Sequence, residues 1–344
     1  MPYREIMEIV ENYSLKKLNT FGVDVTSRYY VELKNEADIL ELLKNQEFIK
    51  GEKLFLGGGS NILFTKNFDG WIAKISTKGN RVIEENENEV LVESSAGEKW
   101  NDFVTYCVEK NFYGVENLSL IPGSVGAAPI QNIGAYGAEL KDVFESLDGI
   151  IIQTGEKKSF NKKECQFDYR NSIFKKKYKD DFLITKVTFR LNKEKKFNFN
   201  YRAFQSYLKP GDQNKLTLRE VSELVKKIRR DKLPNPQKYG NAGSFFKNPE
   251  VDADKIHELQ ESFADLVHFK VENDKYKISA GWLIEKCGFR GKNIGKVGTY
   301  KKQALVIINF GDATGDEIKN FSESIQKAVL NKFGVNLTPE VNIY

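Results

Sequence analysis

An arginine among aromatic residues is the first feature of this sequence that could do chemistry. Arg170 lies in CQFDYRNSIFK, residues 165–175, with Phe167, Tyr169 and Phe174 close by in the chain. Aromatic neighbours exclude water, and a partly desolvated guanidinium can hold a carboxylate through two parallel hydrogen bonds. A structural ion pair, or stacking on one of the rings, explains the same pattern equally well, so these readings stay open.

A serine and a glutamate are the other two chemical candidates. Ser244 follows Asn241–Gly243 and precedes two phenylalanines, so its hydroxyl is expected at a turn beside an apolar wall. It is not in a G-x-S-x-G motif and no histidine is near it in the chain, which argues against an acyl-transfer nucleophile. Glu340 lies among apolar residues in the stretch 336–344, which is predicted to form one strand.

Three successive glycines form a candidate anion site. They are followed by a serine and an asparagine and stand between two apolar runs: Gly57, Gly58, Gly59, Ser60 and Asn61. The G-x-G-x-x-G template fails at Ile62, and the Gly-Lys-Ser/Thr of a Walker A motif is missing. Backbone N–H groups of such a run can still curl around an anion, and Ser60 and Asn61 add donors. We favour a diphosphate site here; a plain glycine-rich turn is the alternative.

The stretch 117–138, NLSLIPGSVGAAPIQNIGAYGA, has no charged residue in a chain that is 29% charged. Prolines and glycines interrupt its apolar runs, so it is neither a membrane span nor a regular helix or strand. Glycines and alanines allow its backbone to approach another group closely. The stretch is therefore either a slot for a flat heterocycle with polar edges or a tightly packed structural turn.

The remaining sequence supplies the elements that must position these residues. Thr217–Glu220 is a capping box that opens a helix, and Pro234 and Pro236 mark a domain boundary after it. Alternating apolar residues predict a strand at 182–191. Helices are predicted at residues 35–45, 97–110, 139–144, 217–230, 279–287 and 316–333.

Composition narrows the class of protein. The length of 344 residues allows two or three domains with a sizeable core. Three scattered cysteines and two histidines argue against a disulfide framework or a Cys/His metal site and indicate a reducing compartment. The charged start lacks the apolar core of a signal peptide, and the net charge of +5 is spread out. We expect a cytoplasmic protein without metal, nucleic-acid partner, membrane insertion or obligatory protein partner.

Seven motifs, taken in order, resemble one family. They are NTFGVD (19–24), GGGSNILF (57–64), IPGSVGAAPIQNIGAYGAE (121–139), YRNSIFK (169–175), GNAGSFFKNP (240–249), AGWLIEKCGF (280–289) and LTPEVNIY (337–344). The set closely resembles the bacterial UDP-N-acetylenolpyruvoylglucosamine reductases, flavoenzymes that make UDP-N-acetylmuramate for peptidoglycan. The resemblance runs from about residue 15 to residue 344. Tyr201 looks like the lid tyrosine of the longer subtype, although Arg202 follows it where glycine would be expected.

The resemblance implies an α+β fold. It consists of a flavin-binding fold of the vanillyl-alcohol-oxidase type, in two α+β subdomains with FAD between them, and a C-terminal α+β substrate-binding domain. On this chain the subdomains would cover residues 1–75 and 76–230, with an FAD-binding region at about 23–193. The substrate-binding domain would cover 231–330, and 331–344 would return Glu340 to the active site on a strand.

The resemblance also implies roles for individual residues. Arg170, Ser244 and Glu340 match catalytic positions. The residues implied for non-covalent FAD are Gly57, Gly58, Gly59, Ser60, Asn61, Ile121, Pro122, Gly123, Ser124, Gly126, Ile133, Gly134, Ala135, Gly137 and Arg229, although Arg230 fits the last position as well. The residues implied for the substrate are Tyr201, Lys232, Asn248 and Gln303.

The implied reaction is ping-pong reduction of UDP-N-acetylglucosamine enolpyruvate with NADPH. Flavin N5 gives a hydride to the terminal carbon, and Ser244 protonates the α-carbon. Arg170 and Glu340 stabilise the enediolate-like intermediate, provided that Glu340 carries a proton or orients Arg170 or a water. A flavin-dependent alcohol oxidase of the same superfamily and a non-catalytic nucleotide-binding module are the alternatives. The flavin stretches lack the His or Cys that such oxidases often use for covalent attachment, and three converging catalytic candidates argue against the module.

Overall fold

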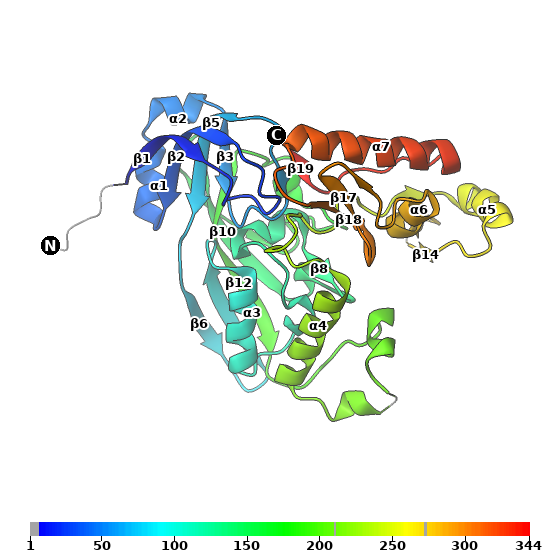
Figure 1. The fold of residues 1–344 in the computed structure, drawn as a ribbon. Coiled ribbons are helices and arrows are strands. Elements are labelled where there is room, and N and C mark those ends of the chain that lie inside the picture. Colours follow the sequence, from blue (N-terminus) through cyan, green and yellow to red (C-terminus); the bar gives the residue numbers. More distant parts are fainter. Residues whose placement is uncertain (1–6, 210, 272–273) are drawn as a thin grey trace. The chain divides into compact units, whose positions relative to one another are not determined.

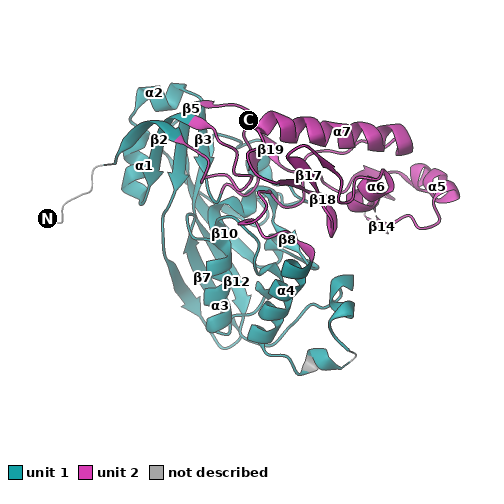
Figure 2. Ribbon diagram, viewed as in Figure 1, with its two compact units in different colours: residues 1–13, 27–58, 69–231 teal, residues 14–26, 59–68, 232–344 magenta. Residues whose placement is uncertain are grey.

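The computed structural model describes residues 7–209, 211–271 and 274–344 (Figure 1). They divide into two compact units, each assembled from separate stretches of chain (Figure 2). Unit 1 contains the described residues up to Tyr13, Ser27–Gly58 and Asp69–Asp231. Unit 2 contains Ser14–Thr26, Gly59–Phe68 and Lys232–Tyr344. Both units combine helices with sheets, so the predicted α+β class is confirmed.

A four-stranded sheet and two short helices form the first part of unit 1. Its elements are β1 (Ile9–Ser14), β2 (Thr26–Leu33), α1 (Glu36–Leu42), α2 (Gln46–Lys50), β3 (Lys53–Leu56) and β5 (Phe68–Ile75). The strand order is β1-β2-β5-β3, and β3 runs parallel to β5. The helix predicted at 35–45 is confirmed as α1, which the Asn35 side chain caps, although it already ends at Leu42. The Asn45 side chain caps a second helix, α2, which was not predicted from the sequence.

A five-stranded antiparallel sheet forms the second part of unit 1. Its elements are β6 (Asn80–Glu85), β7 (Glu89–Ser95), α3 (Trp100–Glu109), β10 (Phe144–Ile151), β11 (Lys157–Asn161), β12 (Phe182–Asn192) and α4 (Leu218–Lys232). The strand order is β11-β10-β12-β7-β6. Trp100 and Phe103 of α3 pack on Phe189 of β12, with ring centroids 5.8 and 4.4 Å apart. These fully buried rings anchor α3 to the sheet and thereby fix the loop that follows it.

Small sheets and three helices form the described part of unit 2. Its elements are β4 (Ile62–Leu63), β13 (Glu250–Val251), α5 (Ala253–Ser262), β14 (His268–Lys270), β15 (Tyr276–Ile278), α6 (Ala280–Lys286), β16 (Asn293–Ile294), β17 (Val297–Tyr300), β18 (Gln303–Asn309), α7 (Gly315–Phe333) and β19 (Asn342–Ile343). The strand orders are β13-β15-β14 and β16-β17-β18, and β19 pairs in parallel with β4. The helix α7 ends at Gly334 with φ of 62°, as the sequence predicts.

The strand predicted at 336–344 is wrong in extent. Only Asn342–Ile343 form β19, and Glu340 precedes it. Pro339 has no N–H to donate to a ladder, and only an isolated bridge joins it to Phe246.

Within the described ranges, every helix is too short or too polar to cross a bilayer.

Candidate functional site

The stretch 117–138 folds into short turns, as its composition predicts. They are three 3-10 turns (Glu116–Leu118, Val125–Ala127 and Pro129–Gln131) and the hairpin of β8 (Gly134–Ala135) and β9 (Ala138–Glu139). The stretch is docked on the residues before and at the start of α3. The N–H of Trp100 donates to the Gly123 carbonyl at 3.0 Å, and the N–H of Gly126 donates to the Ala96 carbonyl at 2.9 Å. A Cβ on Gly126 would lie 2.5 Å from that of Ala96, so this glycine is required by packing within the protein.

Two of the glycine stretches predicted to hold FAD contact each other in unit 1. A Cβ on Gly58 would lie 2.8 Å from the Cα of Gly123, and one on Gly57 would overlap the hydroxyl of Ser124. The amine of Lys74 donates a hydrogen bond to the Gly57 carbonyl. The result is a surface of closely packed backbone beside a lysine and a serine hydroxyl. Such a surface fits a diphosphate, which is bound by backbone N–H groups and positive charge.

Arg170 is attached to the second predicted flavin stretch. Its φ of 52° lies in the left-handed region. Its Nη2 donates to the Gly134 carbonyl at 2.7 Å and its Nη1 to the Asn132 carbonyl at 3.4 Å. Its guanidinium carbon also lies 5.5 Å from the centroid of the Tyr169 ring. The structure therefore shows the ring contact that was one alternative for Arg170, and it shows that Arg170 and the loop at 132–134 hold each other in place.

Arg229 on α4 faces the same loop. Its side chain hydrogen-bonds Tyr136, and its Nε is buried without a partner in the described part of the chain. Burial lowers the pKa of Arg229 and raises the pKa of Tyr136. Arg230 is instead exposed and lies 4.0 Å from Glu223. Of the two arginines between which the sequence could not decide, Arg229 is thus the one beside the predicted flavin stretch.

Tyr201, the predicted lid tyrosine, packs against the same loop. The ring of Tyr201 is 5.6 Å from that of Tyr136 and perpendicular to it. Its Cβ would lie 3.7 Å from a Cβ placed on Gly137. Tyr201 is nevertheless 49% exposed, so about half of the residue remains accessible to a ligand.

Ser244 and Glu340 lie on neighbouring segments of unit 2. The N–H of Glu340 donates to the carbonyl of Phe245 at 2.8 Å, one residue beyond Ser244. The Asn61 side chain donates to the Glu340 carbonyl at 3.2 Å. Ser244 is exposed, whereas Phe245 beside it is fully buried and anchors the turn. The structure thus brings together a predicted proton donor, a predicted acid and one residue of the GGGSN motif.

The other residues predicted for unit 2 lie at three places. The Gly59 carbonyl accepts the N–H of Thr20 at 3.0 Å, so the NTFGVD motif holds the GGGSN loop. Near the start of α6, the Asn248 Oδ1 accepts the N–H of Ala280 at 3.0 Å. The Gln303 Oε1 accepts the N–H of Leu305 at 3.3 Å and would lie 3.2 Å from a Cβ on Gly281. Lys232 is exposed at the end of α4.

The predicted site residues are divided between the units. Unit 1 contains Gly57, Gly58, Ile121, Pro122, Gly123, Ser124, Gly126, Ile133, Gly134, Ala135, Gly137, Arg170, Tyr201 and Arg229. Unit 2 contains Gly59, Ser60, Asn61, Lys232, Ser244, Asn248, Gln303 and Glu340.

Sequence reasoning missed three residues in or beside these loops. Asn132 is fully buried and its amide donates to Glu139 and to the Asp168 carbonyl, at 3.1 and 3.2 Å. Tyr136 contacts both Arg229 and Tyr201. Both Asn132 and Tyr136 have positive φ, which the sequence does not display, so their place in an uncharged, glycine-rich stretch was the one signal for them. Lys74 carried no such signal, because only the pairing of β3 with β5 brings it to Gly57.

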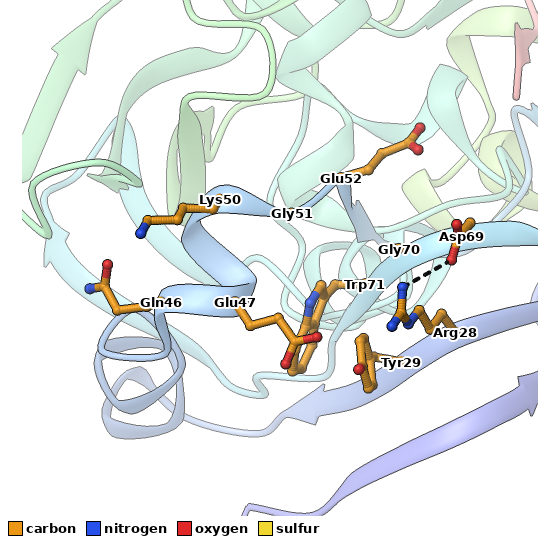
Figure 3. A pocket seen from close by; sticks show the side chains of 10 residues that line it. All are labelled: Arg28, Tyr29, Gln46, Glu47, Lys50, Gly51, Glu52, Asp69, Gly70 and Trp71. Carbon is orange, nitrogen blue, oxygen red and sulfur yellow. Dashed lines mark ion pairs between the residues drawn. The ribbon is translucent and has the colours of Figure 1, made fainter.

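A surface pocket of about 470 Å³ lies elsewhere in unit 1 (Figure 3). Trp71 and Tyr29 stack at its edge with centroids 4.4 Å apart, and Arg28 pairs with Asp69 at 3.5 Å. None of the predicted site residues is among those that line it.

Known proteins resemble this chain over nearly its whole length. Residues 235–344 match the family model of the UDP-N-acetylenolpyruvoylglucosamine reductase C-terminal domain, and residues 27–158 match that of an FAD binding domain. UDP-N-acetylenolpyruvoylglucosamine reductases of Flavobacterium johnsoniae and Amoebophilus asiaticus are 45% and 46% identical over 98% of this chain and 100% and 99% of theirs. That of Pseudomonas aeruginosa is 44% identical over 98% of this chain and 99% of its own.

A solved structure is similar too. The crystal structure of UDP-N-acetylenolpyruvylglucosamine reductase from Thermus caldophilus has a TM-score of 0.66 and 18% identity, and the match covers 98% of this chain and 99% of that one. This similarity and the FAD binding domain confirm the predicted flavin-binding fold.

Proposed function

Because the chain belongs to the UDP-N-acetylenolpyruvoylglucosamine reductase family, we propose which of its residues perform that family's reaction. The protein is an FAD-containing oxidoreductase that reduces UDP-N-acetylglucosamine enolpyruvate to UDP-N-acetylmuramate with NADPH, a step of peptidoglycan synthesis. When bound, FAD accepts a hydride from NADPH and supplies one to the terminal carbon of the enolpyruvyl group. Because the chain belongs to this family, the alcohol oxidase and the nucleotide-binding module are no longer alternatives.

Arg170 binds the substrate carboxylate in this proposal. Hydride arrival places negative charge on the α-carbon and the carboxyl oxygens, and a guanidinium can stabilise that charge through two hydrogen bonds. The observation that carries the assignment is the attachment of Arg170 to the carbonyls of Gly134 and Asn132. A side chain held in this way is preorganised and needs no rearrangement as the charge develops.

Ser244 delivers the proton to the α-carbon. A hydroxyl is a weak acid, but a carbanion next to a carboxylate is a stronger base, so the position of the donor matters most. The fully buried Phe245 and the bond from Glu340 to its carbonyl hold that position. Glu340 acts beside Ser244 as a protonated acid or as a residue that orients Arg170 or a water.

The remaining residues hold the cofactor and the substrate. Residues 57–61 take the FAD diphosphate, 121–126 and 133–137 take the isoalloxazine with Arg229, and Tyr201, Lys232, Asn248 and Gln303 take the UDP-sugar. The domain bounds are those predicted from the sequence: 1–75, 76–230, 231–330 and 331–344. The reaction occurs in the cytoplasm, by a ping-pong sequence.

The half-reactions of Ser244→Ala test this assignment. NADPH should bleach the bound flavin at the wild-type rate, because proton delivery to the sugar plays no part in that step. Reoxidation by the enolpyruvyl sugar should slow by on the order of 10²–10⁴-fold. Ser262→Ala, at an exposed serine of α5, is the matched control and should behave as wild type. Wild-type reoxidation in Ser244→Ala would disprove the proton-donor role.

A further inference from the structure

Lys74 has no role in the reaction above, although it lies beside the predicted diphosphate site. It is on β5 between Ala73 and Ile75, whose buried side chains point to the opposite face of the sheet, and Lys74 itself is partly buried. In the parallel pairing of β3 with β5, Lys74 is opposite Leu56, the last residue of β3. The residue after Leu56 is Gly57, so the sheet register brings the lysine to the start of the glycine loop.

Lys74 binds a backbone carbonyl of the glycine loop. Its Nζ donates to the Gly57 carbonyl, which belongs to the peptide unit that joins Gly57 to Gly58. The described residues contain no cis peptide bond. In a trans peptide the carbonyl and the following N–H point in opposite directions. Holding the carbonyl toward Lys74 therefore turns the N–H of exposed Gly58 away from it, which fixes the direction in which this donor can meet a ligand.

Charges of both signs lie near this peptide. Burial lowers the pKa of Lys74, Glu32 raises it, and Lys78 and Lys99 lower it. Lys78 is compensated by Glu98 at 3.2 Å. The backbone of Lys99 bridges to Ser124, so it too belongs to the place where the two glycine stretches meet. A partly desolvated ammonium is stabilised by an anion that binds beside it.

We propose that Lys74 is a positioning residue for the FAD diphosphate: it orients the Gly57–Gly58 peptide and adds positive charge to the site. This inference rests on the proposed placement of the diphosphate on residues 57–61. The ligand class is a dinucleotide anion, and the lysine acts on its diphosphate and not on its rings.

Flavin fluorescence on serial dilution of the holoprotein measures the Kd for FAD and tests the proposal. Lys74→Met should raise the Kd about tenfold, the order expected when one nearby charge of a partly buried site is lost. It should also flatten the dependence of the Kd on NaCl, because fewer charges remain to be screened. Lys74→Arg keeps the charge and should recover most of the affinity. Lys44→Met removes an exposed lysine paired with Glu41 and should change nothing.

Two further measurements separate the possible failures. Riboflavin has no diphosphate, so its binding to the deflavinated protein should be the same in wild type and Lys74→Met; equal losses for riboflavin and FAD would overturn the proposal. So would a wild-type Kd and salt dependence in Lys74→Met. Gly58→Ala tests the underlying site, because its Cβ would lie 2.8 Å from Gly123. Normal FAD binding by Gly58→Ala would show that the diphosphate does not bind at this loop. Weak FAD binding by Gly58→Ala together with normal FAD binding by Lys74→Met would refute only the role of Lys74.

Discussion

Replacing both members of the Arg229–Tyr136 pair should stabilise the FAD-free protein. The Nε of Arg229 is buried without a partner in the described chain, and a buried donor left unsatisfied costs about 1–3 kcal/mol. Arg229→Met alone would also leave the Tyr136 hydroxyl without its bond, at a similar cost, so the single variant should be close to neutral. The double variant Arg229→Met/Tyr136→Phe removes both polar groups and keeps the volume. It should therefore gain about 1 kcal/mol or more.

Thermal unfolding with and without FAD measures this effect. A gain of about 1 kcal/mol corresponds to a rise in Tm of about 2–4 °C for a unit of this size. The increase in Tm that FAD produces should shrink in the double variant, because the stabilisation by a ligand grows with the logarithm of its affinity and a cation beside the predicted flavin stretch is gone. Arg230→Met, at the exposed neighbour, should leave both values within the experimental error. A double variant that melts below wild type without FAD would show that the Arg229–Tyr136 pair is a net stabiliser and would refute the reasoning.

Two further predictions concern ionisable groups away from the loops. The Arg190 guanidinium bonds Glu145 at 2.9 and 3.0 Å and lowers the pKa of that carboxyl, so the stability it contributes is present above the ordinary carboxyl pKa and lost as the pH falls through the lowered value. Glu145→Gln should lower the Tm at pH 7, by the equivalent of at most about 1 kcal/mol because the pair is partly exposed, and should have no effect near pH 2; an equal loss at both pH values would contradict this. Burial raises the pKa of Cys165 to about 12 and also raises the pKa of Cys107 and Cys287. At pH 8 a maleimide should label partly exposed Cys287 first, as peptide mass spectrometry would show; rapid labelling of Cys165 in the native protein would be inconsistent with its burial.

Local patterns sufficed to predict much of the fold. The apolar spacing of α7 and Gly334 at its end specify that helix, and the capping box of Thr217 specifies the start of α4. Both signals act within a few residues, so the sequence displays them directly. The same holds for the irregular turns at 117–138, where glycines and prolines exclude regular structure.

Features that depend on contacts distant in sequence could not be predicted. The choice between Arg229 and Arg230 depends on where Tyr136 lies, more than 90 residues earlier in the chain. Lys74 reaches Gly57 only through the register of two parallel strands. The extent of the last strand depends on the segment that pairs with Pro339, and strand propensity contains no information about that segment.

The pairing of β4 with β19 sets the order in which unit 2 can fold during synthesis. Thr65 donates through its N–H and its hydroxyl to the Tyr344 carbonyl, at 2.7 and 2.8 Å, and the two residues are 279 positions apart. The early segments of unit 2 therefore leave the ribosome without their final neighbours and must wait for almost the whole chain. In a cell, this interval is when β4 exposes apolar Ile62 and Leu63 to other chains, so chaperones should matter most for nascent molecules that have not yet been extended to Tyr344.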